Sequence, residues 1–318
     1  MTTTRLRDLS LGLHEGTRAL PDGRLTGNGR WTSPVYQPGP FTWAIASWNG
    51  SGERIEVEMR AAAPGGWSPW FTFGPWSDRG ARHSVEGQTV EGVGRLSTDT
   101  LLLAQSARGW QVRVTLQAAE LRGLWVATAL PGRPAPDEAY QEAWGLELDV
   151  PMLSQMIYPN GGNVWCSPTS LAMVMAYWGV SESIPDTVVP AVYDSVYDGH
   201  GNWVFNTAYA GARGFEAYVD RFRSFAELER EIAAGYPVIA SVSYKKEWLP
   251  NAPISLTGGH LLVVRGFTNT GDVIVNDPAA ASNEGVRLVY QRDLFRRAWL
   301  DRAGVVYRIR PLLDTKSA

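Results

Sequence analysis

Residues 163–179, NVWCSPTSLAMVMAYWG, hold the only cysteine of the chain at the start of a predicted helix. Apolar residues recur at helical spacing, and one face is expected to carry Leu171, Val174, Met175 and Trp178. Gly179 follows directly and is the expected C-terminal stop. The stretch therefore predicts a helix with the thiol of Cys166 at its N-terminus.

The position of Cys166 favours a reactive thiol. The preceding loop, YPNGGNVW, is rich in turn-forming residues, and Pro168 falls in the first helical turn, where proline is tolerated. A thiol at a helix N-terminus meets unpaired N–H groups and the positive end of the helix dipole, and both lower its pKa. The alternative is a structural cysteine, because free cysteines are often buried.

A nucleophilic thiol needs a base, and the candidates are His14, His83, His200 and His260. His14 and His83 fall in a region of predicted strands, and His200 falls in a loop. His260 begins the apolar run HLLVVRGF, after Gly258 and Gly259, which leave room for a substrate backbone. His260 is therefore the expected base. The alternative is a histidine whose hydrogen bonds are satisfied within the core.

Asp277 is the expected partner of His260. It ends the next predicted strand, and a turn over Thr268–Gly271 would bring the two side chains together, where a carboxylate orients the imidazole. Asn276 competes for this role, but its side chain faces the other side of the strand. An aspartate that only caps a turn is the structural alternative. Gln155, 11 residues before Cys166, is the candidate oxyanion donor together with the Cys166 backbone N–H.

The hydrophobic patterns and the composition change along the chain, and this change predicts two domains that fold separately. Residues 1–30 are polar and glycine-rich and are interpreted as an extended lead-in. Residues 31–130 carry many short alternating strands, which favour an all-β sandwich or jelly roll. Residues 131–146 hold three prolines and are expected to form a linker. Residues 147–318 show helices first and antiparallel strands afterwards, which predicts an α+β catalytic domain.

The aromatic cluster Trp67, Trp70 and Trp76 lies within the predicted β domain. One interpretation is packing in the core and at sheet edges. The other is an exposed platform for a glycan or a cell-wall polymer. Stacking on a sugar needs exposure, which the sequence does not determine.

Composition excludes several classes of function. The chain has 318 residues, of which 44% are hydrophobic, so it can bury a large core. A net charge of −3 argues against nucleic-acid binding. No apolar run is long enough to span a membrane. A single cysteine permits no internal disulfide, and the four scattered histidines form no zinc pattern, so neither metal nor cofactor is expected. The opening residues have no apolar signal segment, so the chain as written is expected to be cytoplasmic, or extracellular if its true N-terminus is missing.

The order of these motifs resembles the C39-like peptidase group of the papain-fold cysteine peptidases. The resemblance covers about residues 147–310 and is carried by VPMLSQ, NVWCSPTSLAMVMAYWG, GGHLLVVRGF and VIVNDPAA. It implies a papain-like fold for this half, with Cys166 as nucleophile, His260 as base, Asp277 as orienting residue and Gln155 as oxyanion donor.

The resemblance implies hydrolysis of a peptide or protein substrate. Trp165, next to the nucleophile, and Gly258–Gly259 are then expected to contact that substrate. Bacteriocin-processing members usually have a shorter gap between Gln and Cys, Asp-Cys-Gly around the nucleophile, and a fused ATPase. This chain has Trp165 and Ser167 around the cysteine and no GxxxxGK[ST] motif. Two alternatives remain open: an acyltransferase on the same scaffold, and a catalytically silent domain in a glycan-binding or cell-wall-binding protein.

Overall fold

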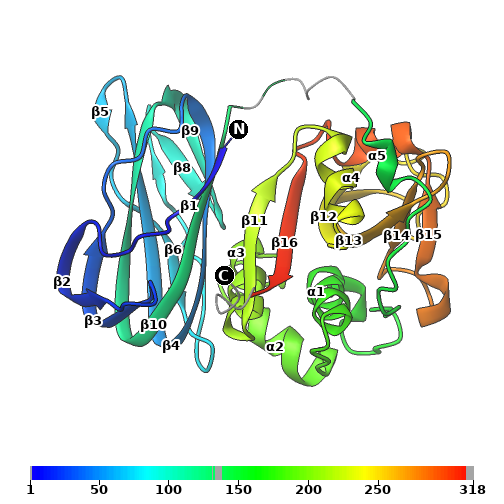
Figure 1. Ribbon diagram of the computed structural model, residues 1–318, viewed down its shortest axis with the longest axis horizontal. Helices are drawn as coiled ribbons and strands as arrows, with labels where there is room; N and C mark the ends of the chain where they lie inside the picture. The colour runs from blue at the N-terminus through cyan, green and yellow to red at the C-terminus, as the bar shows by residue number, and fades with distance from the viewer. Residues whose placement is uncertain (1, 131, 133–137, 313–318) are drawn as a thin grey trace. The chain divides into compact units, whose positions relative to one another are not determined.

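The structure is a computed structural model that describes residues 2–130, 132 and 138–312. The chain divides into two compact units. The first comprises residues 1–131 and 193–219, and the second comprises residues 132–192 and 220–318. Figure 1 labels the helices and strands of both units.

The first unit is built on one hydrogen-bonded sheet, and the described residues contribute these strands: β1 (Thr2–Arg5), β2 (Leu13–Ala19), β3 (Leu25–Thr32), β4 (Phe41–Ala63), β5 (Gly66–Trp67), β6 (Phe71–Trp76), β7 (Thr89–Val90), β8 (Gly94–Ser97), β9 (Thr100–Ala107) and β10 (Gly109–Ala129). The strand order is β2-β3-β10-β4-β9-β8-β7. In addition, β1 pairs with β10, and both β5 and β6 pair with β4. The unit is therefore mainly β, as the sequence predicts.

Two long strands replace several of the short strands that the sequence predicts. β4 has 23 residues and β10 has 21, and they pair with each other over almost their whole length. The Gly50–Gly52 stretch reads as a turn in the sequence, but the chain continues through it in extended pairing. A Cβ at Gly52 would lie 2.4 Å from the Ala118 carbonyl oxygen, so glycine is needed here for close strand approach rather than for a reversal.

The lead-in predicted for residues 1–30 is wrong. These residues form three paired strands, with Thr2–Arg5 lying along the end of β10 and residues 13–32 forming the β2–β3 hairpin. Leu25 is fully buried and Leu6 nearly so. The polar composition misleads because one side of the hairpin faces solvent, and its glycines occupy backbone conformations open mainly to glycine.

The segment 193–219 lies within the second half of the sequence but belongs to the first compact unit. It contains α3 (Trp203–Ala212) and most of β11 (Phe215–Arg221). The boundaries expected from sequence place it in the C-terminal domain. The structure instead packs it on β4, with the Trp48 and Phe205 rings 6.3 Å apart in an edge-on arrangement.

Buried polar side chains fix this segment to the sheet. The Asn49 amide donates to the Ala217 carbonyl and accepts from the Ala217 N–H, at 2.6 and 3.0 Å. Ser47 accepts from the Val219 N–H at 3.0 Å. Asp194, fully buried, accepts the Ser84 N–H at 2.9 Å. Because these groups are removed from water, losing one partner would leave the other unsatisfied.

The three clustered tryptophans do not share one environment. Trp76 is buried with 1% exposure, which fits core packing, whereas Trp67 is 41% exposed. The Arg60 guanidinium lies over both the Trp67 and Trp70 rings, 4.5 and 4.6 Å from their centroids. The Arg60 side chain therefore covers part of the Trp67 and Trp70 rings.

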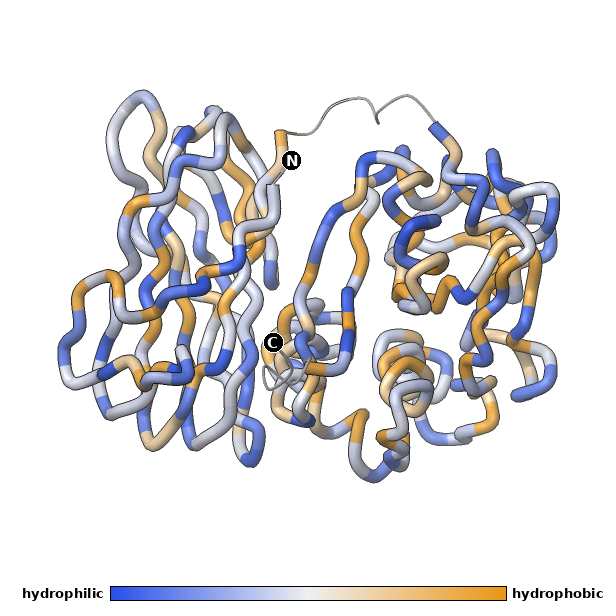
Figure 2. The backbone as a smooth tube through the Cα atoms, viewed as in Figure 1, coloured by the Kyte–Doolittle hydropathy of each residue, from blue (hydrophilic) through white to orange (hydrophobic). Residues whose placement is uncertain are grey.

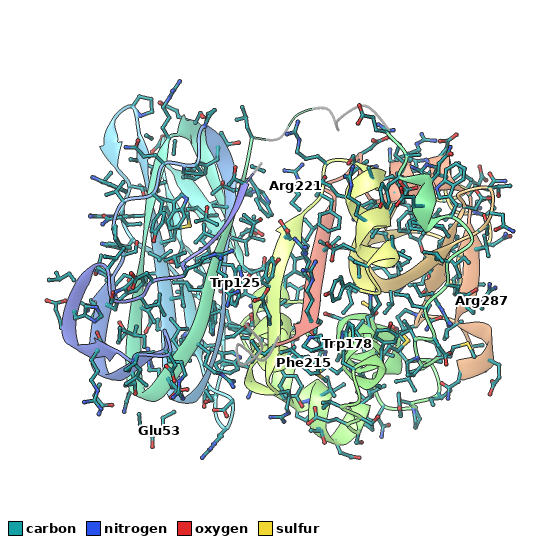
Figure 3. All side chains as sticks on the ribbon, viewed as in Figure 1. Glu53, Trp125, Trp178, Phe215, Arg221 and Arg287 are labelled. Atoms are coloured by element: carbon teal, nitrogen blue, oxygen red, sulfur yellow. The ribbon has the colours of Figure 1, made fainter. Side chains whose placement is uncertain are left out.

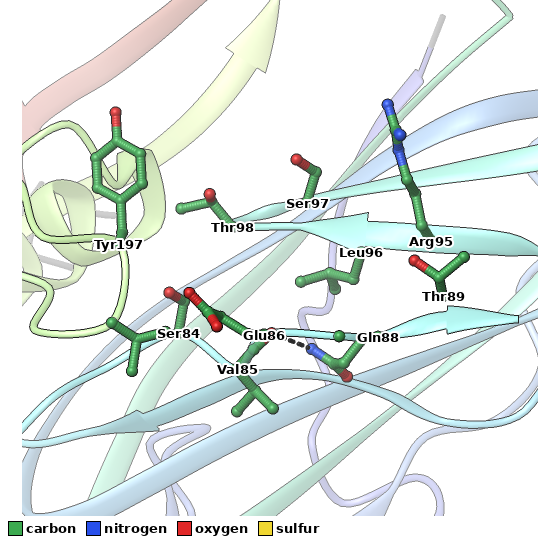
Figure 4. A pocket seen from close by; sticks show the side chains of 12 residues that line it. Ser84, Val85, Glu86, Gln88, Thr89, Arg95, Leu96, Ser97, Thr98 and Tyr197 are labelled. Atoms are coloured by element: carbon green, nitrogen blue, oxygen red, sulfur yellow. Dashed lines mark hydrogen bonds between the residues drawn. The ribbon is translucent and has the colours of Figure 1, made fainter.

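A pocket of about 510 Å³ lies in the first unit (Figure 4). Residues 84–89 and 95–98 line it together with residues 196–197. The Gln88 amide donates to the Val85 carbonyl at 3.2 Å within this lining. The lining contains neither cysteine nor histidine. The pocket is therefore separate from the residues that the sequence selects for catalysis.

The second unit combines helices with an antiparallel sheet, and these are its regular elements: α1 (Cys166–Tyr177), α2 (Val189–Val192), α4 (Phe225–Ala233), β12 (Val238–Tyr244), β13 (Thr257–Phe267), β14 (Val273–Asn276), β15 (Arg287–Tyr290), α5 (Arg292–Ala298) and β16 (Val305–Pro311). The sheet order runs β16-β12-β13-β14-β15. α4 and α5 coincide with helical patterns in the sequence near residues 224–234 and 291–300. A similar pattern over residues 186–197 gives only a short helix, because the chain forms a π-helical turn at Ile184–Val188 and α2 ends at Val192.

α1 is confirmed, but its environment differs from the prediction. Residues 167–175 are all buried, so burial is not confined to one face of the helix. Figure 2, which colours the backbone by hydropathy, shows the hydrophobic residues along α1. Gly179 has φ +88° and ends the helix as expected, with the Val180 N–H donating to Met175. Trp178, labelled in Figure 3, follows the last helical residue and donates to the Ile309 carbonyl at 3.1 Å. α1 is thus a central helix of the unit.

The end of the expected linker is part of the second unit. Residues 131 and 133–137 lie outside the described residues. The Tyr140 N–H and the Trp144 indole N–H donate to the fully buried Glu229 carboxylate at 2.6 and 2.8 Å. The Trp144 ring also lies against Gly271, where a Cβ would come within 2.6 Å of it. The linker prediction is therefore wrong for residues 140–144, whose aromatic side chains pack on the core.

None of the helices in the described ranges is long and apolar enough to cross a membrane.

Candidate active site

Cys166 is the first residue of α1, as the sequence predicts. The loop before it turns at Gly161, which has φ +93°, and then forms a short 3-10 turn at Gly162–Val164. Trp165 is 8% exposed and its ring contacts that of Tyr158. The Cys166 side chain is half-buried. The loop thus presents the thiol at the end of a buried helix, where backbone N–H groups lack intrahelical partners.

His260 lies near the start of β13 and is 1% exposed. Its Nε2 is 2.7 Å from Oδ1 of Asp277, and both side chains are almost completely buried. His260 also interacts with the Cys166 side chain, and this interaction raises the pKa of His260 and lowers that of the thiol. The structure therefore brings Cys166, His260 and Asp277 together, with His260 hydrogen-bonded to Asp277.

Sheet register explains why His260 and Asp277 meet. β13 and β14 are antiparallel, with Val263 opposite Asn276, so Asp277 falls on the face that His260 shares with Leu262. The predicted turn is present, with the Gly271 N–H donating to Thr268 and the Thr268 N–H donating to Asp272. A two-strand hairpin thus converts a separation of 17 residues into direct contact.

Asp277 is held by further donors. Tyr290 on β15 donates its hydroxyl to Oδ2 at 2.8 Å, and the Ala279 N–H donates to Oδ1 at 3.0 Å. Sequence reasoning missed Tyr290. The available signal was that a tyrosine at a core position needs a partner for its hydroxyl.

The ionisation of the chain follows from these contacts. Burial raises the pKa of the Cys166 thiol, but the hydrogen bond and charge of His260 and a backbone hydrogen bond from Leu261 outweigh it, so the thiol pKa is lowered. Burial lowers the pKa of His260, but the adjacent Asp277 carboxylate and the Cys166 sulfur raise it overall. Burial raises the pKa of Asp277, whereas His260 and Tyr290 lower it below its usual value. The arrangement favours thiolate, imidazolium and carboxylate together.

Asn276, the competing candidate, faces a different set of partners. Its Oδ1 accepts from Arg265 at 3.1 Å, and its amide donates to the Val150 and Pro151 carbonyls at 3.3 and 3.1 Å. Asn276 therefore anchors the segment that leads to Gln155, and none of its hydrogen bonds reaches His260.

Gln155 is 1% exposed and contacts both the residue after Asp277 and the loop before Cys166. Its backbone N–H donates to the Pro278 carbonyl at 2.8 Å, directly after Asp277. A Cβ at Gly162 would lie 2.1 Å from the Gln155 carbonyl oxygen, so only glycine lets the loop before Cys166 pack this closely. Within the described residues the side-chain Oε1 is buried without a hydrogen-bond partner. The amide is thus in place beside the loop and is not tied to the surrounding protein through its oxygen.

Gly258 and Gly259 are exposed and immediately precede His260. A Cβ built on either one would meet no atom within 4 Å, so the space beside them is open. The other histidines considered, His14, His83 and His200, belong to the first unit, whereas Cys166 belongs to the second. Across the part of the chain that the structure describes, no group of three or more His, Cys, Asp or Glu side chains could hold a metal ion.

Comparison with known protein families gives two matches. Residues 147–307 match the model of the Peptidase_C39 like family, and residues 2–127 match that of the Peptidase C39 N-terminal domain. The search of the curated proteins found no match.

Two similar solved structures have low scores. A protein from Bacillus anthracis assigned to the C39-like peptidases is 19% identical, covers 53% of this chain and 98% of its own, and has a TM-score of 0.38. The GH26-CBM35 β-(1,4)-mannanase of Podospora anserina is 11% identical, covers 54% of this chain and 35% of its own, and has a TM-score of 0.25. The family match spans half of the chain, and we conclude that the chain belongs to the Peptidase_C39 like family, with a cysteine peptidase-like domain in its C-terminal half.

Proposed function

We propose that the chain is a cysteine peptidase that cleaves a peptide or amide bond through Cys166, His260 and Asp277. The observation that carries the proposal is the buried hydrogen bond between His260 and Asp277 beside Cys166, where the thiol pKa is lowered and the imidazole pKa is raised. Such a pair holds a nucleophilic thiolate next to a proton donor.

The proposed reaction begins with attack of the Cys166 thiolate on the carbonyl carbon of the substrate. The carbonyl oxygen becomes an oxyanion, which the Gln155 side-chain amide and the Cys166 backbone N–H stabilise. His260 then gives its Nδ1 proton to the leaving amine, the C–N bond breaks, and a thioester forms. Neutral His260 next takes a proton from water, the resulting hydroxide equivalent attacks the thioester, and the thiolate is released.

The supporting residues have separate proposed roles. Asp277 holds the imidazole through Nε2, so that Nδ1 points at the sulfur. Gly258 and Gly259 leave open space for the substrate backbone, and Trp165 forms a wall beside the nucleophile. In the proposed fold, the C-terminal domain is papain-like, because a helix beginning with the cysteine packs on the strand that carries the histidine. For the N-terminal domain we propose a β-sandwich or jelly roll, in which its one hydrogen-bonded sheet folds back on itself.

The substrate-library screen that tests this proposal uses the full chain beside Cys166→Ala and His260→Ala. Each variant is expected to lose turnover while its circular dichroism spectrum stays that of the wild type, because the residues act as one unit. Substantial hydrolysis by Cys166→Ala would exclude the mechanism. Product analysis with added amines separates hydrolysis from acyl transfer. A wild type whose thiol reacts no faster than free cysteine would favour the catalytically silent alternative.

A further inference from the structure

Tyr290 makes a hydrogen bond that the proposed reaction does not account for. Its hydroxyl donates to Oδ2 of Asp277 at 2.8 Å, and the two residues are 2% and 0% exposed. The other carboxylate oxygen, Oδ1, already accepts from His260 and from the Ala279 N–H. Among the described residues, Tyr290 is the donor that reaches Oδ2. The carboxylate is therefore held from both sides.

Rotation of the carboxylate about its Cβ–Cγ bond would move Oδ1 away from His260 and from the Ala279 N–H. The Tyr290 donor on Oδ2 opposes the same rotation from the other oxygen, so it helps to fix the plane in which Oδ1 faces His260 Nε2. The Tyr290 ring is itself fixed, because it stacks on Phe295 with centroids 6.3 Å apart and an angle of 14°. Its hydroxyl is thus a rigid donor aimed at a buried acceptor.

We propose that Tyr290 is a positioning residue that acts on catalysis through Asp277, by holding the carboxylate in the orientation that presents Oδ1 to His260. This inference rests on the function proposed above. Tyr290 is not a catalytic residue, because it contacts Asp277 and not the reacting atoms.

The charges around Asp277 support this role. The titratable groups that face it are His260 on β13, Cys166 on α1, Tyr244 on β12 and Tyr290 itself. Burial raises the pKa of the Asp277 carboxyl, and the His260 interactions and the Tyr290 hydrogen bond act in the opposite direction. Without the Tyr290 hydroxyl, a buried anionic oxygen would lose its donor, so the carboxyl would protonate at a higher pH.

Tyr290→Phe in the full chain tests the proposal, with Tyr244→Phe as the matched control. Tyr244 is equally buried at 3% exposure, but its hydroxyl donates to the Ile254 carbonyl at 3.1 Å and not to Asp277. Both variants keep the ring and lose one buried hydroxyl. The first readout is the ¹³C titration of the Asp277 carboxyl by NMR. The second is the pH profile of Cys166 alkylation by iodoacetamide.

In Tyr290→Phe, the Asp277 carboxyl is expected to titrate about one pH unit higher than in the wild type, as for the loss of one hydrogen bond to a charged group. The acid limb of Cys166 alkylation should move in the same direction. Tyr244→Phe should change neither. A role in packing alone would lower the thermal transition in both variants and leave both titrations unmoved, and that result would overturn the proposal.

The two readouts separate this inference from the function on which it rests. If the wild-type thiol reacts no faster than free cysteine, the peptidase proposal fails, and the carboxyl titration still decides the role of Tyr290. If Tyr290→Phe does not fold, 3-fluorotyrosine placed at position 290 keeps the ring and strengthens the donor. The Asp277 carboxyl is then expected to titrate lower, and an unchanged titration would overturn the proposal.

Discussion

Replacing Asp277 by asparagine removes one negative charge and leaves the shape of the side chain almost unchanged. In the native chain Oδ1 of Asp277 lies 2.7 Å from His260 Nε2, with both groups nearly inaccessible to water. An opposite charge at such a distance raises a histidine pKa by about 1–3 units, so its removal should lower the His260 pKa by about that amount. Burial is then opposed only by the interaction with Cys166, so the balance shifts toward neutral imidazole.

The effect passes to Cys166, because the charge of His260 helps to lower the thiol pKa against burial. With a neutral imidazole, the thiol pKa rises, and the pH range that supports a thiolate–imidazolium pair narrows from both sides. The acid limb of Cys166 alkylation should therefore move to higher pH, and at pH values below that limb the rate should fall about tenfold for each pH unit of the move. The assay is the rate of Cys166 alkylation by iodoacetamide from pH 4 to pH 10, followed by mass spectrometry.

The matched control is Asn276→Ala, one residue earlier on the same strand. Asn276 bonds to Arg265, Val150 and Pro151 and not to His260, so its removal should lower the free energy of unfolding by about 1–3 kcal/mol and leave the alkylation profile unchanged. An Asp277→Asn profile identical to that of the wild type would refute the electrostatic reasoning. A profile that changes more in Asn276→Ala than in Asp277→Asn would show that the orienting residue is Asn276.

Two further predictions concern Gln155 and the division of the chain. Gln155→Ala should lower kcat about 10²- to 10³-fold with little change in KM, because one oxyanion donor is lost. Steady-state kinetics on a peptide from the substrate library measures this, and an unchanged kcat would exclude Gln155 from the mechanism. A chain of residues 145–318 should be poorly soluble and bind a hydrophobic dye, because the apolar side chains of segment 193–219, such as Phe205, lose the sheet on which they are buried. A monomeric 145–318 fragment with a cooperative thermal transition would contradict this.

Local signals in the sequence were enough to find most of the candidate site. The thiol at a helix start, the glycines before His260 and the aspartate at a strand end each depend on a few neighbouring residues, and the structure places them together. Two consecutive antiparallel strands are close to each other in the sequence, so the β13–β14 hairpin could also be predicted from local residues.

The parts that sequence reasoning missed depend on distant contacts. Nothing near Gly52 in sequence indicates that Ala118 approaches it, so the sequence predicts short strands where β4 continues as one long strand. Alternation in the strand VRLVY places Tyr290 in the core but does not identify Asp277 as its acceptor. The partners of Asn49 lie 168 residues away, which hides the link between segment 193–219 and β4.

The interleaved division of the chain has a consequence for its synthesis on the ribosome. The first compact unit includes residues 193–219, but the ribosome synthesises residues 132–192 of the other unit before it reaches them. Chains fold from the N-terminus as they emerge, at roughly 5–20 residues per second. For several seconds, therefore, the sheet of the first unit lacks α3 and β11, while part of the second unit is already outside the ribosome. Recombination at one position could therefore not exchange the whole N-terminal unit, because the unit consists of two separate stretches of sequence and the second ends at Val219.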